Sequence, residues 1–226
     1  MINPALIGTI AASSSQQLFP APTSYWNLQT DGNDAVGGLN FTNNGVVFGS
    51  GHGAFNGSAD LTQSNASALQ LGSGDWTILT WVYLNALPNY VAVLAKGTGS
   101  NGEYEIFADP FDGGFYINVY RPGSGSDFVR FGGLAPATGV WHFLCGQYVA
   151  SSGTLRLLAN AATTFSSVIV GAPPRTTTEA LTLGNRAGGS FRLNGRMRFT
   201  GLFKGTLLDA DAIAYYYNSG NGRAYP

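Results

Sequence analysis

The sequence predicts an all-β, antiparallel two-sheet sandwich that ends in one short helix. Short apolar runs recur along the chain, and clusters of Gly, Asn, Ser and Pro separate them. A helical period appears only near the C-terminus. About a dozen short strands without intervening helices favour a sandwich over a parallel α/β fold. The length of 226 residues fits one large sandwich.

Composition narrows the classes of partner. Charged residues make up 10% of the chain, against roughly 25% in a typical soluble domain, and glycine occurs 32 times. Such neutral polar surfaces are common in extracellular and virion proteins, so we expect one of those locations. The net charge of −1 gives no basic field for nucleic acid. No apolar stretch approaches 18 residues, so no membrane span is expected, and no signal peptide is recognised.

Two segments differ in character. Residues 1–23 combine a Ser/Gln run with spaced prolines and show no hydrophobic period, which predicts an extended N-terminal arm. The arm is either a floppy terminus or a segment that docks on a neighbouring subunit. Residues 24–226 form the predicted globular domain.

The strands follow in order from residue 53. The run 76–84 places Trp76, Ile78, Val82 and Leu84 on one face and Leu79, Trp81 and Tyr83 on the other, so it needs cover on both sides. Trp76, Trp81, Trp141 and Phe143 are expected to share one dry interior. The predicted strands are Gly53–Phe55, Ala68–Leu71, Trp76–Leu84, Val91–Lys96, Tyr104–Ala108, Phe115–Tyr120, Phe128–Phe131, Val140–Tyr148, Leu155–Ala159, Ser167–Val170, Leu181–Gly184 and Arg196–Phe203.

One helix is predicted after Asp209, which can cap the run 210–217. Ile213 with Tyr216 or Tyr217 gives an apolar stripe, and Asn218-Ser219-Gly220 ends the helix. The single cysteine, Cys145, lies in an apolar run and is expected to be a buried structural residue.

The order of several motifs resembles the laminin-G-like branch of the concanavalin A-like lectin/glucanase superfamily. The resemblance covers about Tyr25 to the C-terminus and implies a jelly roll that recognises glycans or a surface protein. The matching segments are Tyr25-Trp26-Asn27-Leu28, Ala54-Phe55-Asn56-Gly57-Ser58-Ala59-Asp60, Trp76-Thr77-Ile78 with Trp81-Val82, Leu94-Ala95-Lys96-Gly97, Gly139-Val140-Trp141-His142-Phe143, Thr154-Leu155-Arg156-Leu157, Leu181-Thr182-Leu183-Gly184-Asn185 and Leu207–Gly220.

A structural Ca²⁺ site is a weaker implication. Where the family often has acidic residues after Gly-Arg, this chain has Gly195-Arg196-Met197-Arg198-Phe199, so a site built on them is in doubt. The sequence offers other candidate oxygen ligands for Ca²⁺, which are Asp31, Asn33, Asp34 and Asp60. Asn and Asp also form turns, and that interpretation is favoured.

Glycan binding would use loop aromatics beside polar groups. The candidates are Tyr90, Phe111 with Asp109 and Asp112, and Tyr120 with Arg121. The arginines Arg186, Arg192, Arg196 and Arg198 form a local basic group, which is either a solvated strand face or a phosphate site, and the former is favoured.

Hydrolysis would need two carboxylates on one face. Glu103 and Glu105 are two positions apart, so on a strand they would share one face and lie about 7 Å apart by strand rise. That spacing fits a glycosidase pair, but the surrounding glucanase pattern is missing, so no enzyme is expected.

Three functions therefore compete. The first is a non-catalytic lectin-like module that binds glycans or a surface protein. The second is a structural phage virion protein, for capsid decoration or the tail, which would contact other subunits through the arm or form a homo-oligomer. The third is a glycoside hydrolase. No cofactor other than Ca²⁺ is implied.

Overall fold

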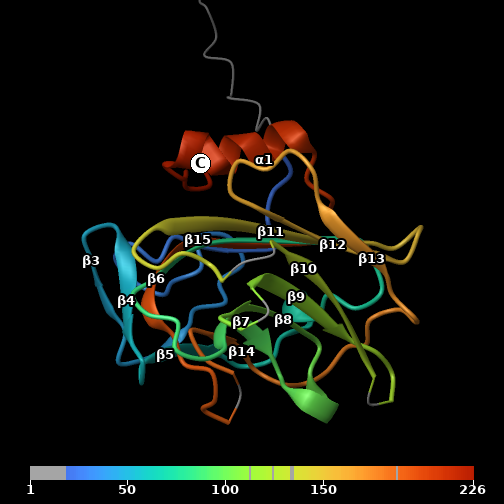
Figure 1. The fold of residues 1–226 in the computed structure, drawn as a ribbon, viewed down its shortest axis with the longest axis horizontal. Helices are drawn as coiled ribbons and strands as arrows, with labels where there is room; N and C mark the ends of the chain where they lie inside the picture. The colour runs from blue at the N-terminus through green and yellow to red at the C-terminus, as the bar shows by residue number, and fades with distance from the viewer. Residues whose placement is uncertain (1–18, 112, 124, 133–134, 187) are drawn as a thin grey trace, which may run out of the picture.

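The chain folds into three layers (Figure 1). The computed structural model describes residues 19–226 except 112, 124, 133–134 and 187. Two antiparallel sheets, A and B, pack face to face, and the helix α1 (Ala210–Tyr217) lies on the outer side of sheet A. The predicted two-sheet sandwich with one C-terminal helix is therefore confirmed.

Each sheet joins strands that are distant in sequence. Sheet A has the order β13 (Ser166–Ile169), β12 (Thr154–Ala159), β11 (Trp141–Val149), β6 (Trp76–Leu84), β15 (Asn194–Lys204), β4 (His52–Asn56) and β3 (Val47–Gly49), and β1 (Ser24–Trp26) also pairs with β15. Sheet B has the order β10 (Ser126–Phe131), β9 (Gly114–Tyr120), β8 (Tyr104–Asp109), β7 (Val91–Lys96), β14 (Leu181–Leu183), β5 (Asp60–Gln63) and β2 (Thr42–Asn44).

The strand β6 separates two hydrophobic cores. Its residues Trp76, Ile78, Val82 and Leu84 face sheet B and join the large core between the sheets. Its alternate residues, Leu79 and Trp81, face outward and are buried in a second core with Phe143 and the helix residue Ile213. The expected cover on both faces of this strand is confirmed. One expectation was wrong: Trp76 does not share an interior with Trp81 and Phe143, because period-two alternation sends them to opposite faces. Trp141 is partly exposed and packs against the second core.

The helix is bounded as the sequence predicts. The Asp209 side chain accepts a hydrogen bond from the backbone N–H of Ala212 at 2.9 Å. Asn218 ends the helix in the left-handed conformation, with φ of 48°. Tyr216 is 1% exposed, and Cys145 lies in the same core, where burial raises the pKa of its thiol to about 12. The thiol is therefore protonated at neutral pH.

Some elements differ from the expected strands. Residues 68–71 do not form a strand, because Ser67–Leu69 form a 3-10 turn and the Leu71 N–H donates to the Glu103 carboxylate at 2.7 Å. The strands β1, β2, β3 and β5 were not predicted; β2 has the sequence Thr-Asn-Asn, which shows no apolar period. Two further 3-10 turns span Gly99–Asn101 and Asn218–Gly220.

A buried ion pair holds one end of sheet B. Lys96 is fully buried and Glu103 is 1% exposed, and their charged atoms lie 3.4 Å apart. Burial lowers the pKa of Lys96 and raises the pKa of Glu103, and their mutual attraction opposes both shifts. We assign both groups as charged. Lys96 donates to the Asn65 side-chain oxygen and to the backbone carbonyls of Thr177 and Glu179, while Glu103 accepts backbone N–H groups.

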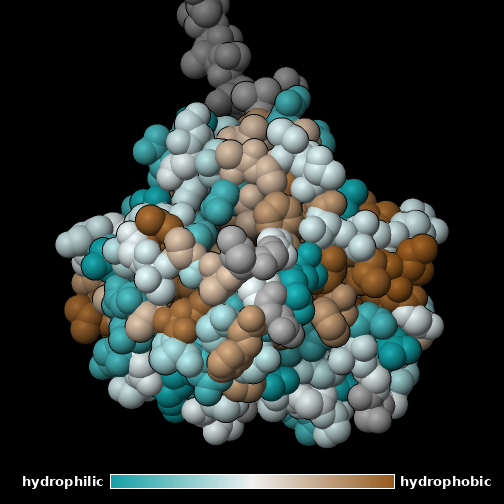
Figure 2. All heavy atoms as spheres, in the orientation of Figure 1, coloured by the Kyte–Doolittle hydropathy of each residue, from teal (hydrophilic) through white to brown (hydrophobic). Residues whose placement is uncertain are grey.

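The exposed apolar surface lies partly at the edges of sheet A. Figure 2 shows brown surface over β13 at one side and over β3 at the other. Ile169 on β13 is 75% exposed and Val47 on β3 is 71% exposed. Across the described part of the chain, no helix has the length and apolar character needed to cross a membrane. The first described residue, Phe19, packs on Tyr215, but residues 1–18 lie outside the described residues, so the N-terminal arm stays a prediction.

Candidate functional site

A cleft of about 600 Å³ lies on the outer face of sheet B. Alternation along β8 and β9 produces it: Tyr104, Ile106 and Ala108 point into the core, whereas Glu105 and Phe107 point outward. The antiparallel register pairs Glu105 with Asn118 and Phe107 with Tyr116. Four outward side chains from two neighbouring strands therefore form the floor of the cleft.

A row of five aromatic rings crosses the cleft. The rings of Phe107 and Tyr116 stack in parallel with centroids 4.9 Å apart. Tyr90 lies 6.0 Å from Phe107 and 5.6 Å from Phe191, and Phe128 continues the row 5.4 Å from Tyr116. Phe128 is 54% exposed. The row comes from β8, β9, β10 and two loops, and it gives the cleft an apolar side.

The loop that carries Phe191 is held by backbone contacts. The Arg186 N–H donates to the Ser190 carbonyl at 3.1 Å, and the Ala92 N–H donates to the Phe191 carbonyl at 2.7 Å. Phe191 has a φ of 60°, in the left-handed region that bulky residues rarely occupy. The closed loop places Arg186 and Phe191 together at the cleft, and the Arg186 guanidinium lies 5.3 Å from the Phe191 ring centroid.

A polar cluster forms the other side of the cleft. Glu105 is 4% exposed and lies 3.0 Å from the Nε of Arg186. It accepts hydrogen bonds from the Tyr120 hydroxyl at 2.8 Å and the Asn118 amide at 3.0 Å. Burial and the Glu105 charge raise the pKa of Tyr120 to about 12, so its hydroxyl keeps its proton. The Oδ1 atom of Asn118 is buried and has no hydrogen-bond partner among the described residues.

Tyr120 is fixed by groups outside the cleft. A Cβ atom on Gly102 would lie 2.3 Å from the Tyr120 ring, so only glycine permits this packing. The Arg175 guanidinium lies 5.6 Å from the Tyr120 ring centroid and donates to the carbonyls of Gly102, Gly123 and Gly99. One arginine therefore ties together two loops at this end of sheet B.

The arrangement suits binding of a ligand with apolar and polar edges. Aromatic rings can contact the C–H face of a sugar, and the polar cluster offers donors and acceptors for hydroxyl groups. Glu105 is already neutralised by Arg186. The second carboxylate that lines the cleft, Asp109, is four residues along β8, about 13 Å away by strand rise. That separation exceeds the roughly 5–9.5 Å of glycosidase pairs.

The predicted Glu103–Glu105 pair does not form a joint site. The Glu103 carboxylate accepts the N–H groups of Leu71 and Thr177 and pairs with Lys96, whereas Glu105 lines the cleft. The same strand parity is present, but Glu103 precedes β8 and turns toward another segment. The spacing that suggested a glycosidase pair therefore does not bring the two carboxylates together, which agrees with the expectation of no catalytic pair.

The predicted glycan-contact residues divide into three groups. Tyr90, Asp109 and Tyr120 line the cleft. Phe111 is 68% exposed and lies at its rim, 5.6 Å from the Tyr90 ring. Arg121 is outside the lining and pairs with Asp127 at 3.0 Å, while Asp112 lies outside the described residues.

Several cleft residues were not predicted. The alternation in the predicted strands 104–108 and 115–120 was the available signal for most of them, because polar and aromatic side chains share one face there. Arg186 was noted only as one of a local basic group, and its place in the cleft, like that of Phe191, depends on a long-range loop contact that local sequence does not show. The lining residues that were not predicted as glycan contacts and that have aromatic, amide or basic side chains are Phe107, Tyr116, Asn118, Phe128, Arg130, Arg186 and Phe191.

The calcium candidates do not combine into one site. Asp34 accepts four backbone N–H bonds, from Tyr25, Val36, Gly37 and Leu39. Asp31 accepts both the backbone and side-chain amides of Asn33. These carboxylates therefore make turns. Within the described ranges, no group of three or more His, Cys, Asp and Glu side chains is placed to hold a metal ion.

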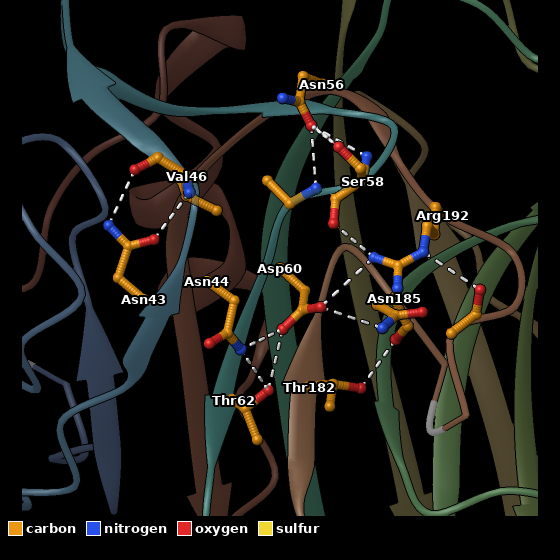
Figure 3. A network of polar contacts seen from close by, with 12 residues as sticks. Asn43, Asn44, Val46, Asn56, Ser58, Asp60, Thr62, Thr182, Asn185 and Arg192 are labelled. Carbon is orange, nitrogen blue, oxygen red and sulfur yellow. Dashed lines mark hydrogen bonds and ion pairs between the residues drawn. The ribbon is translucent and has the colours of Figure 1, made fainter.

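Asp60 lies in a separate polar network (Figure 3). One carboxylate oxygen accepts from Asn44 and Thr62, and the other accepts from Asn185 at 3.2 Å and lies 3.5 Å from Arg192. Arg192 also donates to the Ser58 carbonyl at 2.6 Å. The donor set around Asp60 consists of amides, a hydroxyl and a guanidinium, which does not fit a cation.

Comparisons with known proteins agree on the fold. The binding domain of botulinum neurotoxin serotype G is similar to this chain with a TM-score of 0.66 and 12% identity, over 89% of this chain and 52% of that domain. The binding domain of botulinum neurotoxin DC in complex with SialylT gives a TM-score of 0.64 and 13% identity, over 87% and 50%. The chain therefore spans about half the length of these domains.

A third similar structure is smaller. The Ruminococcus gnavus IT-sialidase CBM40, bound to alpha2,3 sialyllactose, gives a TM-score of 0.52 and 16% identity, over 62% of this chain and 81% of that one. No curated protein matches the sequence. At these identities the structures show the shared fold alone. A family model described as "Concanavalin A-like lectin/glucanases superfamily" matches residues 53–214, which is most of the chain. The chain belongs to the concanavalin A-like lectin/glucanases superfamily.

Proposed function

We propose that this chain is a non-catalytic, lectin-like recognition module whose glycan ligand lies in the cleft on sheet B. The observation that carries the proposal is the aromatic row opposite the Glu105–Arg186 cluster within one cleft. The aromatic row would contact the C–H face of a sugar, and the buried Oδ1 of Asn118 would accept a sugar hydroxyl. The similar solved structures are binding domains, one of them bound to sialyllactose, which supports the same class of function.

The absence of catalysis is part of the proposal. Glu105 is paired with Arg186, and Asp109 is too distant along β8 for a two-carboxylate mechanism. We expect wild-type protein to release no reducing ends from a panel of polysaccharides. Release that disappears in Glu105→Gln would contradict this part.

A glycan array on the purified full-length chain tests the binding. The array identifies a ligand, and Phe128→Ser then removes an exposed ring from the cleft. Ile169→Ser is the matched control, because it removes an exposed apolar side chain from an edge strand of the other sheet. We expect about tenfold or greater loss of affinity in the first variant and none in the second. Equal effects, or no ligand on the array, would contradict the proposal.

A role as a virion subunit remains a separate hypothesis. It depends on residues 1–23, most of which lie outside the described residues. Light scattering measures the molecular mass of the full-length chain in solution and of a chain without residues 1–23. Equal states of association for the two chains would count against assembly through the arm.

A further inference from the structure

The outer face of sheet A is only partly covered by α1. Tyr217 of the helix stacks on Trp81 at 5.8 Å with ring planes 4° apart, and Trp81 is 1% exposed. Two residues further along β6, Tyr83 is partly exposed, as is its pairing partner Trp141 on β11. The aromatic face of sheet A therefore continues past the end of the helix cover.

Two arginines on β15 extend this uncovered face. Arg196 lies 4.6 Å from the Tyr83 ring centroid, and Arg198 lies 4.4 Å from the Trp141 centroid and 5.1 Å from Trp81. His52 of β4 packs 6.1 Å from Trp141. We call the five residues His52, Tyr83, Trp141, Arg196 and Arg198 the sheet A patch.

Among the residues that the structure describes, the arginines of the patch have no acidic partner. The chain has eleven Lys and Arg residues, and the structure describes all of them. Each of the others has a hydrogen bond or an ion pair, whereas Arg196 and Arg198 have neither with any residue that the structure describes. Burial lowers the pKa of Arg198. Burial also lowers the pKa of His52, and the charges of both arginines add to that shift. The patch is therefore a local positive site in a chain of net charge −1.

The position of the patch limits the kind of ligand. It lies on β11, β6, β15 and β4, none of which is an edge strand of sheet A. A peptide that pairs by adding a strand needs a free sheet edge, which the patch does not offer. Two arginines and one histidine are too few for the extended phosphate contacts of a nucleic acid. A compact ring that carries an anionic group matches the aromatic surfaces and the guanidinium groups.

We propose that the sheet A patch is a second binding site, for an anionic saccharide, on the face of the sandwich opposite the cleft. Trp141 and Tyr83 contact the sugar ring, and Arg196 and Arg198 hold its carboxylate or sulfate. The site is independent of the cleft, because the two lie on the outer faces of different sheets.

Calorimetric titration of the full-length chain tests the site with three probes. A galacturonic acid tetrasaccharide supplies carboxylates, a heparin-derived tetrasaccharide supplies sulfates, and maltotetraose is neutral. We expect at least one acidic probe to bind, with affinity that falls as salt is raised. Arg196→Met with Arg198→Met should weaken that binding about tenfold or more. Failure of both acidic probes to bind overturns the proposal.

Arg223→Met supplies the matched control. Arg223 also stacks on a tyrosine, at 4.5 Å from the Tyr215 centroid, and its loss changes the net charge equally. Arg196→Met alone should weaken binding of the acidic probe, and Arg223→Met should leave it unchanged. Equal effects of the two single variants overturn the proposal, because they would reflect net charge alone. Thermal melts confirm that the variants are folded.

The same titrations separate this site from the cleft. Phe128→Ser should leave the acidic probe bound, and the Arg196→Met, Arg198→Met variant should keep any ligand found for the cleft. If Phe128→Ser abolishes binding of the acidic probe, that probe occupies the cleft and the patch proposal fails. If no neutral or acidic glycan depends on Phe128, the proposed function fails while the patch proposal can stand.

Discussion

The outer faces of the two sheets differ in what covers them. On sheet A, outward residues such as Leu79, Trp81 and Phe143 are buried beneath α1 and form a second core. On sheet B, outward residues such as Phe107, Tyr116 and Glu105 lie under no helix of the described chain and line a cleft. Both faces carry aromatic side chains. The helix that covers a face, rather than the type of its residues, therefore separates a structural aromatic face from one that is available to a ligand.

The largest expected effect concerns the ion pair that supports sheet B. Lys96→Met leaves Glu103 buried without its partner, so we expect the free energy of unfolding to fall by about 3–5 kcal/mol. Lys204→Met is the control, because that side chain is exposed and should change stability by less than about 0.5 kcal/mol. Urea unfolding measures both. Equal losses would show that the pair does not hold this end of the sheet.

The covered and open faces should respond differently to truncation. Ile213→Ala removes a side chain from the core under α1, and we expect a loss of about 2–4 kcal/mol in stability with glycan binding retained. Phe128→Ala should cost less than about 0.5 kcal/mol, because the ring is 54% exposed, but should weaken glycan binding. Urea unfolding and titration with the array ligand provide the two measurements. The opposite pattern would contradict the comparison.

A smaller effect should appear at mildly acidic pH. His142 is 7% exposed between the sheets, and burial lowers its pKa although its Nε2 lies 2.8 Å from the Ala137 carbonyl. The folded state then binds the proton less readily than the unfolded state. Stability is unaffected above the unfolded pKa of about 6.5 and falls below it, by at most about 1.4 kcal/mol per pH unit.

The His142→Gln variant isolates this contribution. As pH falls from 7 to 5, the wild type should lose stability relative to the His142→Gln variant. His52→Gln is the comparison: the pKa of His52 is lowered in the same direction, but His52 is partly exposed on the outer face of sheet A, so its removal should change the pH profile less than the removal of His142. A wild-type profile that matches the His142→Gln profile in shape would assign the acid sensitivity to other groups.

The smallest expected effect is that of a chelator. The Asp34 oxygens accept four backbone N–H groups, and the Asp60 oxygens accept amides and a hydroxyl beside Arg192. We therefore expect the same melting temperature with and without EDTA. A lower melting temperature in EDTA would restore the calcium hypothesis for one of these turns.

Much of the fold could be predicted from local pattern. The bounds of β6 and β7 follow from long apolar runs, and the helix follows from Asp209 and the stripe after it. The strands β2 and β3 could not be predicted in this way. The Thr-Asn-Asn of β2 has no apolar period, and its pairing with β5 comes from the surrounding hairpins.

The candidate site was less predictable than the fold. Tyr104 and Phe107 are both aromatic, yet one faces the core and the other faces the cleft, and local sequence does not say which face is covered. Arg186 reaches Glu105 across 81 positions of the chain, which only the assembled sheet specifies. Loop aromatics were therefore recognised more easily than the strand residues between them.

Mapping the bound glycan by amide NMR tests the central claim most directly. The ligand that the array selects is titrated into isotope-labelled full-length chain, and the shifted backbone amides are assigned. The cleft predicts that the largest shifts cluster on β8, β9 and β10 and on the loop that carries Arg186 and Phe191. Shifts confined to β3, β13 or α1, with the β8–β10 amides unmoved, would contradict it.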